Sequence, residues 1–318
     1  MRIAAVDIGT NTLLMTIADF DANGSMHVLH DAHTIVRLGE NLSHSGVISE
    51  AALQRAVECI RGYRSVCDEL GADIRVGVAT SAVRSASNGT QVLQVLRTEF
   101  KGMLQCISGS EEAELTFAGS VPDEGAYMVL DIGGGSTEIV CGSNRQVEHR
   151  VSHEIGAVML HDRVLHSFPA TECSIAEACM LIQDRAPVMP IFQSESDDGT
   201  REFRRDEDAE SNWIAVAGTP TTLALVAQQL PYTQVEASHG YRLSLNTVSA
   251  LCELLMNTPK NELQDIPGIH PQRADILPAG TLILREIMRS HQCEHVTVST
   301  RGLRFGVILK AYAAASRR

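Results

Sequence analysis

The sequence predicts an α/β protein made of two related domains that face each other across a cleft. Apolar runs with the spacing of strands alternate with runs that have the spacing of helices along most of the chain. Two stretches, AVDIGTNTLLMTI and VLDIGGGSTEIVC, also align without gaps at an offset of about 124 residues, far longer than a solenoid repeat. The aligned pairs include Asp7 with Asp131, Gly9 with Gly133 and Thr12 with Ser136. A duplicated domain accounts for this match better than the general likeness of buried strands that end in Asp-x-Gly.

In the first half of the chain, apolar runs on both sides of DIGTNT predict a strand, a tight loop and a second strand. Residues 49–70 predict a long helix, because apolar residues recur there at spacings of three and four, and Gly71 ends it. The expected strands are residues 2–6, 13–19, 27–37, 74–79 and 103–107, and the other expected helices are residues 90–100 and 111–119.

In the second half, we expect strands at residues 127–130, 213–217 and 296–299 and helices at residues 223–230, 243–256, 279–288 and 306–315. Residues 187–213 carry many charges and few aromatic side chains, which predicts a mobile surface loop. We expect a first domain over residues 1–121 and a second over residues 122–302. A last helix, about residues 303–318, is expected to return and pack on the first domain.

The composition is that of an ordinary globular protein, and 318 residues are enough for two domains. No apolar run approaches the ~20 residues of a membrane span, and an aspartate at position 7 argues against a signal peptide. The eight cysteines include no C-x-x-C pair, and most of them, such as Cys59, Cys106 and Cys252, lie in apolar contexts. We therefore expect reduced core thiols in a cytoplasmic protein, without disulfides or a zinc site.

The formal net charge of −13 argues against broad nucleic-acid binding, although a local basic cleft is compatible with it. Nearly all cationic residues are arginines, since the only lysines are Lys101, Lys260 and Lys310. Arginine is the better bidentate partner for phosphate oxygens. Genomic composition produces the same bias, so the arginine content alone does not identify a ligand.

The stretch VLDIGGGSTEIV is the strongest candidate for a phosphate-binding loop. Gly133, Gly134 and Gly135 leave the backbone N–H groups open to an anion, and the hydroxyl of Ser136 adds a donor. Asp131, at the end of the preceding strand, suits a hard cation, and Glu138 begins the next strand and is expected to face the same cleft. A dinucleotide-binding fingerprint would open a helix rather than a strand. A plain hairpin turn needs only one or two glycines.

Two further loops supply similar groups. The loop DIGTNT offers Asp7, Thr10, Asn11 and Thr12. In AGTPTT, Gly218 and Thr219 precede a helix whose N-terminus favours an anion, although the threonines of this loop also suit simple helix capping. Together the three loops predict a converging phosphate site.

The segment SGSEEAEL predicts both a helix cap and a catalytic carboxylate. Ser108 and Glu111 have the spacing of a capping box, which leaves Glu112 free to act as a general base for water. Arg84 is surrounded by small residues, so its guanidinium is a candidate phosphate ligand, with a surface salt bridge as the alternative. Near the C-terminus, the charged residues with two open roles, lining the cleft or joining the domains, are Arg273, Asp275, Arg301 and Arg304.

With these motifs in order, the sequence resembles the exopolyphosphatase / guanosine pentaphosphate phosphohydrolase (Ppx/GppA) family over nearly the whole chain. The matching segments are VDIGTNTLLMTIAD, RLGENL, ATSAVRSASNG, ISGSEEAEL, VLDIGGGSTEIV, IGAVML, AGTPTTLA, GIHPQRADILPAG and VSTRGLRFG. The resemblance implies two ribonuclease-H-like domains of the actin-like ATPase superfamily around a cleft, in the short two-domain form. One departure is Thr300, where many relatives carry an acidic or other polar residue.

The resemblance also assigns roles by position. It implies that Glu112 activates water, that Asp131 and Glu138 hold Mg²⁺ or Mn²⁺, and that Arg84 belongs to the family's T-x-x-x-R segment. It implies phosphate contacts from Asn11, Gly133, Gly134, Gly135 and Ser136. A cytoplasmic homodimer is expected.

The predicted function is an exopolyphosphatase that releases terminal orthophosphate from inorganic polyphosphate. The alternatives are a guanosine pentaphosphate (pppGpp) phosphohydrolase and a non-catalytic regulator that binds polyphosphate or guanosine tetraphosphate (ppGpp). The presence of every expected carboxylate disfavours the regulator. A sugar or acetate kinase of the same superfamily is disfavoured by the segment that carries Glu112.

Overall fold

The computed structural model describes residues 1–21, 23–122, 124–188 and 212–317. Most of the predicted loop over residues 187–213 lies outside the described residues. Within the described part of the chain, no helix combines the length and the apolar character that crossing a membrane requires.

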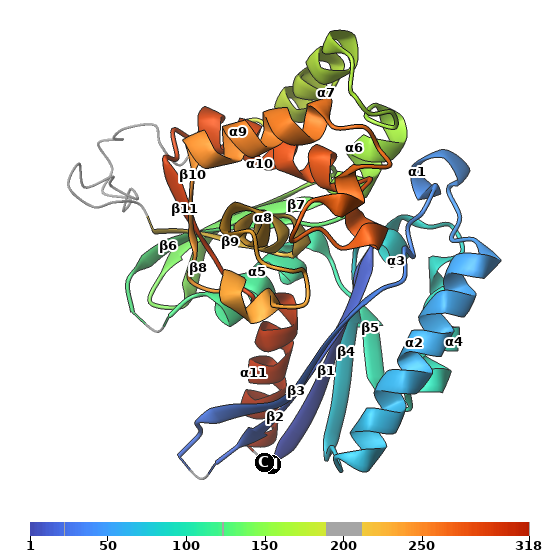
Figure 1. The fold of residues 1–318 in the computed structure, drawn as a ribbon. Helices are drawn as coiled ribbons and strands as arrows, with labels where there is room; N and C mark the ends of the chain where they lie inside the picture. Colours follow the sequence, from blue (N-terminus) through green and yellow to red (C-terminus); the bar gives the residue numbers. More distant parts are fainter. Residues whose placement is uncertain (22, 123, 189–211, 318) are drawn as a thin grey trace, which may run out of the picture.

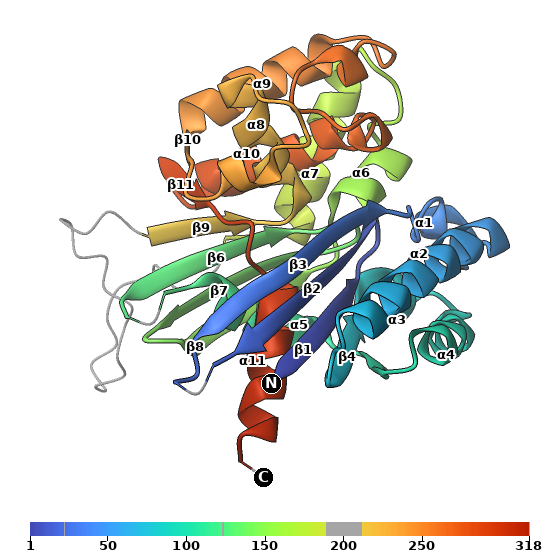
Figure 2. The ribbon, with the colours of Figure 1, turned by 60° about the horizontal axis from the view of Figure 1, so that its bottom comes forward.

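Two mixed sheets form the framework, and both contain parallel and antiparallel pairs (Figures 1 and 2). The first sheet has the order β3-β2-β1-β4-β5, and the second has the order β10-β11-β9-β6-β7-β8. The strands of the first sheet are β1 (Arg2–Ile8), β2 (Thr12–Phe20), β3 (Met26–Ile35), β4 (Ile74–Ala79) and β5 (Met103–Cys106). Those of the second are β6 (Ala126–Ile132), β7 (Thr137–Ser143), β8 (Gln146–His153), β9 (Asn212–Val216), β10 (Arg242–Ser244) and β11 (His295–Val298).

The internal repeat is visible in the backbone. With β10 set aside, strands β8-β7-β6-β9-β11 repeat the order β3-β2-β1-β4-β5. Both copies of the loop close in the same way, because the Gly9 N–H donates to Thr12 O at 3.2 Å and the Gly133 N–H donates to Ser136 O at 3.0 Å. The predicted fold class, two related α/β domains around a cleft, is therefore confirmed.

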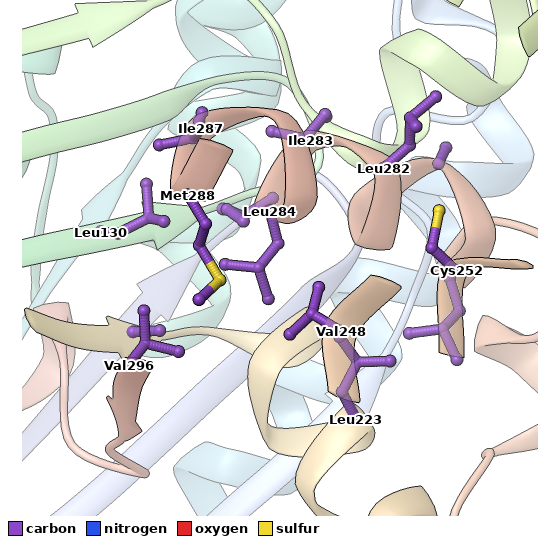
Figure 3. Close-up of a cluster of buried hydrophobic side chains, with 14 of the residues drawn as sticks. Leu130, Leu223, Val248, Cys252, Leu282, Ile283, Leu284, Ile287, Met288 and Val296 are labelled. Atoms are coloured by element: carbon purple, nitrogen blue, oxygen red, sulfur yellow. The ribbon is translucent and has the colours of Figure 1, made fainter. Parts of the chain in front are cut away.

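Helices cover both faces of each sheet. They are α1 (Leu42–Ser45), α2 (Glu50–Glu69), α3 (Ser81–Ser85), α4 (Gly89–Phe100), α5 (Gly109–Ser120), α6 (Ala157–Arg163), α7 (Glu172–Arg185), α8 (Gly218–Gln228), α9 (Leu245–Asn257), α10 (Leu277–Ser290) and α11 (Leu303–Ala315). On the first sheet, α2 and α4 bury one face and α11 the other. On the second sheet, the largest core lies under α7 to α10, where Leu284 and Met288 of α10 lie beside Leu130 and Val296 of the strands (Figure 3).

Helices α5 and α11 are exchanged between the two sheets: each follows a strand of one sheet and packs on the other sheet. Helix α5 follows β5 of the first sheet, yet its Phe117 packs with Val129 and Val140 of the second sheet. Helix α11 follows β11 of the second sheet, yet its Ile308 packs with Ile3 of the first sheet. The two helices touch where Gly306 of α11 lies against the backbone carbonyl of residue 115, so closely that a Cβ atom there would collide with it.

Gly306→Ala is expected to destabilise the protein by about 1–3 kcal/mol, because the new methyl group forces the two helices apart. Gly62→Ala in α2 is the matched control, since no atom lies within 4 Å of the added Cβ and an exposed helical glycine gains up to about 1 kcal/mol as alanine. Urea unfolding of both variants measures the difference. Equal stability of the two variants would show that the contact has no packing role.

Most expected elements are present with shifted ends, but some predictions need correction. The helix expected over residues 223–230 is α8, which begins at Gly218, so Gly218 and Thr219 lie in its first turn rather than before it. The helix expected from residue 243 starts at Leu245, because Arg242–Ser244 pairs with β11 as β10 and Ser244 Oγ then accepts the Thr247 N–H at 3.0 Å. Strands β8 and β10 and helices α1, α3, α6 and α7 were not predicted. All eight cysteines are free, but Cys106 and Cys173 are exposed, so the expectation of core thiols is wrong for these two.

Candidate active site

A cavity of about 480 Å³ lies between the two domains. Its walls include all three predicted phosphate loops, which reach it because each follows the end of a central strand, β1, β6 or β9. The predicted residues on its surface are Asp7, Thr10, Asn11, Thr12, Glu112, Asp131, Gly133, Gly134, Gly135, Ser136, Gly218 and Thr219. Arg84 and Glu138 are the two predicted residues that are not part of this lining.

Three carboxylates line the cavity, on β1, α5 and β6, and a fourth is buried close to them on β7. They belong to Asp7, Glu112, Asp131 and Glu138, and their charges interact with one another. Burial, followed by the neighbouring Glu112 charge, raises the pKa of Asp131 to about 7. Burial and then the charges of Glu112 and Asp131 raise the pKa of Asp7 and of Glu138 well above the usual range. Such crowding of like charges favours the binding of a cation or of protons.

Glu112 is 7% exposed and is held by Arg84, whose Nη1 donates to Glu112 Oε2 at 3.0 Å and to Ile107 O at 2.9 Å. Burial raises the pKa of Glu112, while the Arg84 guanidinium opposes that rise. Arg84 therefore forms a salt bridge in this structure, but with the buried predicted base rather than at the surface, and its role as a phosphate ligand stays a prediction. Nothing in the sequence pairs residues 84 and 112, since β5 and the turn into α5 separate them.

The N-terminus of α5 forms only half of the predicted capping box. Ser108 Oγ accepts the Glu111 N–H at 3.2 Å, as expected. The Glu111 carboxylate, however, does not return to the cap and instead accepts from Lys310 Nζ at 2.8 Å. Glu112 is thus the carboxylate of this segment that reaches the cavity.

Glu138 lies behind Asp131, which it faces in the β6–β7 pairing, and is 1% exposed. Ser152, its partner across β7 and β8, donates to Glu138 Oε1 at 2.7 Å. The expectation that Glu138 faces the cleft directly is therefore corrected, because the side chain is buried and does not line the cavity. The sequence pattern could not show this, because β8 was not predicted.

Two of the three consecutive glycines lie against the opposite domain. A Cβ atom on Gly134 would lie 2.8 Å from Thr10 Cβ, and one on Gly135 would lie 2.5 Å from Ser81 Oγ. The run of glycines thus permits close approach between the domains as well as open N–H groups. Ser81, which the sequence analysis missed, follows β4 directly and lines the cavity.

The four charged residues near the C-terminus divide between the two roles left open. Arg273 lines the cavity and donates to Gly218 O at 2.9 Å and to Thr12 Oγ1 at 3.1 Å, and burial lowers the pKa of its guanidinium to about 10. Arg301 and Arg304 also line the cavity, but Arg304 is already paired with Asp31 at 2.7 Å. Asp275 joins the domains through an ion pair with Arg37.

The carboxylates at the cavity fit a magnesium-type ion. Asp7 Oδ1 is buried without a hydrogen-bond partner, and oxygen donors are what a hard cation prefers. In the part of the chain that the structure describes, no three His, Cys, Asp or Glu side chains are placed to hold one ion together. Mg²⁺ commonly takes one or two carboxylates and completes its shell with water and phosphate oxygens, so the absence of a three-residue group is compatible with such an ion.

A model of the Ppx/GppA phosphatase family matches residues 16–314. The chain belongs to this family. Exopolyphosphatase 2 of Mycobacterium tuberculosis is 31% identical to this Ppx/GppA protein over 324 aligned residues, which cover 97% of this chain and 98% of the relative. Both findings confirm the resemblance that the motifs carried, and membership makes the protein a phosphatase.

Solved structures of the Ppx/GppA family have the same fold. An exopolyphosphatase from Cytophaga hutchinsonii is 27% identical with a TM-score of 0.84, and the match covers 99% of this chain and 98% of that one. The family member from Aquifex aeolicus has a TM-score of 0.75 at 24% identity, with 99% and 98% of the two chains covered. The latter likeness supports the fold alone.

Proposed function

We propose that this Ppx/GppA protein is an exopolyphosphatase that releases terminal orthophosphate from inorganic polyphosphate. The observation that carries the proposal is the position of Glu112 and Asp131 in one cavity with three loops of backbone and hydroxyl donors. The names of the Mycobacterium tuberculosis and Cytophaga hutchinsonii relatives support polyphosphate as the substrate.

In this proposal, the loops bind the terminal phosphoryl group. The N–H groups of residues 134–136 and the hydroxyls of Thr10 and Thr12 offer donors from both domains. Arg273 adds a cation that donates only to neutral oxygens among its described hydrogen bonds. Donors fixed before the substrate arrives stabilise the charge of the transition state without further reorganisation.

Glu112 is the proposed base. Its carboxylate lines the cavity, and burial raises its pKa, which makes the carboxylate a stronger base for a proton of water. Arg84 holds the carboxylate in one orientation and favours its ionised form. Positioning of water for in-line attack is the main contribution of the protein in phosphoryl transfer.

We further propose that Asp131, supported by Glu138 and joined by Asp7, holds Mg²⁺ or Mn²⁺. When bound, the ion would neutralise the phosphoryl oxygens and the crowded carboxylates. Asp131 is oriented by Thr116, whose Oγ1 lies 3.4 Å from Asp131 Oδ2. Thr116 stands one turn after Glu112 on α5, so a single helix orients both the proposed base and a proposed metal ligand.

Purified protein is expected to release orthophosphate from polyphosphate with a higher kcat/KM than from pppGpp or ATP, because the site binds a terminal phosphoanhydride and needs no nucleoside. Phosphate release with each substrate at equal concentration of chain ends measures this. Turnover of pppGpp without polyphosphate would support the nucleotide phosphohydrolase, and tight binding without turnover would support the regulator. Sedimentation velocity on the same preparation tests the expected homodimer.

A further inference from the structure

An ion pair joins the two domains beside the cavity. Arg37 lies immediately beyond β3 of the first sheet, and its Nη2 donates to Asp275 Oδ2, which belongs to the second domain, at 2.7 Å. The two side chains are 28% and 14% exposed, so the pair is shielded from solvent more than an ordinary surface pair. In such a setting, loss of either partner leaves a poorly solvated charge.

Arg37 is tied through its backbone to the first phosphate loop. The N–H groups of Val36 and Arg37 both donate to Asn11 O, at 3.0 and 2.9 Å, and the Gly39 N–H donates to Thr10 O at 2.8 Å. These bonds fix residues 36–39 to the loop. The position of Arg37 therefore affects the position of Thr10 and Asn11, which line the cavity.

Asp275 is linked to the third loop through its neighbour Arg273. It stands two residues after Arg273, which donates to Gly218 O in the third loop and to Thr12 Oγ1 in the first. A weaker contact lies on the same side, where His44 Nε2 is 3.0 Å from Asp162 O. Of the contacts just described, that of Arg37 with Asp275 joins two charged side chains, and Arg37 Nε also lies 3.6 Å from Glu40 Oε1 of its own domain.

We propose that the Arg37–Asp275 ion pair is a positioning element, which holds the first phosphate loop against the third loop, in the second domain, and keeps the cavity closed. Neither residue is among those that line the cavity, so the pair acts through the loops. Without it, the closed form becomes a smaller fraction of the free protein. The apparent affinity for substrate falls by that fraction, whereas bound substrate still closes the site, so KM rises and kcat is kept.

The test is a double-mutant cycle with Arg37→Gln, Asp275→Asn and both together. Each single variant is expected to raise the KM for short polyphosphate about tenfold, with kcat within about threefold of the parent. The double variant is expected to match the single variants rather than to multiply their effects. The matched control is Arg61→Gln, because Arg61 pairs with Glu99 at 2.8 Å within the first domain, and its KM should not change.

Small-angle X-ray scattering of the free variants gives an answer that does not depend on catalysis. Both single variants are expected to have a larger radius of gyration than the parent and the Arg61→Gln control. This inference rests on the proposed function only in its kinetic measurements. If the protein has no polyphosphatase activity, the scattering measurement still decides whether the ion pair keeps the domains closed. Unchanged scattering, or KM effects that multiply in the double variant, would overturn the proposal. If the Arg37→Gln variant fails to fold, Arg37→Lys replaces it, because lysine keeps the charge but lacks the planar guanidinium. The lysine variant should show a smaller rise in KM and a smaller increase in the radius of gyration than expected for the glutamine variant.

Discussion

Glu112→Gln is expected to reduce kcat for polyphosphate by at least about a hundredfold, the usual contribution of a general base. Glutamine keeps the shape and the contact with Arg84 but cannot accept the proton of the attacking water. Substrate affinity is expected to change only a few-fold, because the loops that bind phosphate are untouched. Steady-state phosphate release and a direct binding measurement with the same polyphosphate separate the two effects.

The neighbouring residue offers the control. Glu111→Gln removes a carboxylate that pairs with Lys310 at the protein surface and should leave kcat within about twofold, since a surface pair contributes little. A Glu112→Gln enzyme that kept more than a tenth of the parent kcat would require a different base, and the other carboxylates of the cavity would then be tested in turn.

Removal of divalent cations with excess EDTA is expected to abolish hydrolysis, and Mg²⁺ or Mn²⁺ should restore it. No lysine lines the described part of the cavity, and the crowded carboxylates would otherwise repel a polyanion. Asp131→Asn and Glu138→Gln are each expected to raise the Mg²⁺ concentration needed for half-maximal activity. The effect should be larger for Asp131, which lines the cavity, than for Glu138, which lies behind it.

Isothermal titration of Mg²⁺ into the parent and these variants measures the same affinity without catalysis. The Ser143→Ala variant serves as a control, because Ser143 donates to Glu148 on the exposed β7–β8 hairpin at 2.6 Å and is remote from the proposed ligands. Full activity in excess chelator would remove the metal from the mechanism and leave Arg273 and the loop donors to balance the phosphate charge.

The sequence was sufficient for the fold and for the three loops because both depend on local signals. A strand that ends in Asp-x-Gly and continues into hydroxyl residues defines a loop within about a dozen residues, and its second copy defines the repeat. The ends of paired strands must then meet at one edge of each sheet, which brings Asp7 and Asp131 to the same cavity.

What the sequence could not supply depends on contacts between distant segments. The partner of Glu112 is Arg84, 28 positions away along the chain, and the hydroxyl that holds Glu138 comes from Ser152 on a strand with little apolar alternation. Asp275 meets a partner 238 positions away. No periodicity encodes such pairs, because each is set by how the sheets and helices finally pack.

The exchange of α5 and α11 between the two sheets makes the protein a single folding unit despite its duplicated plan. A fragment that ended near residue 121 would keep α5 without the β-strands that bury Phe117, and it would lack α11, which shields Ile3. The complementary fragment would carry α11 without the sheet that it covers. Each half would therefore expose an apolar face in isolation, so neither is an independent module. Each domain contributes a helix to the core of the other, so unfolding of one domain is expected to cause unfolding of the other.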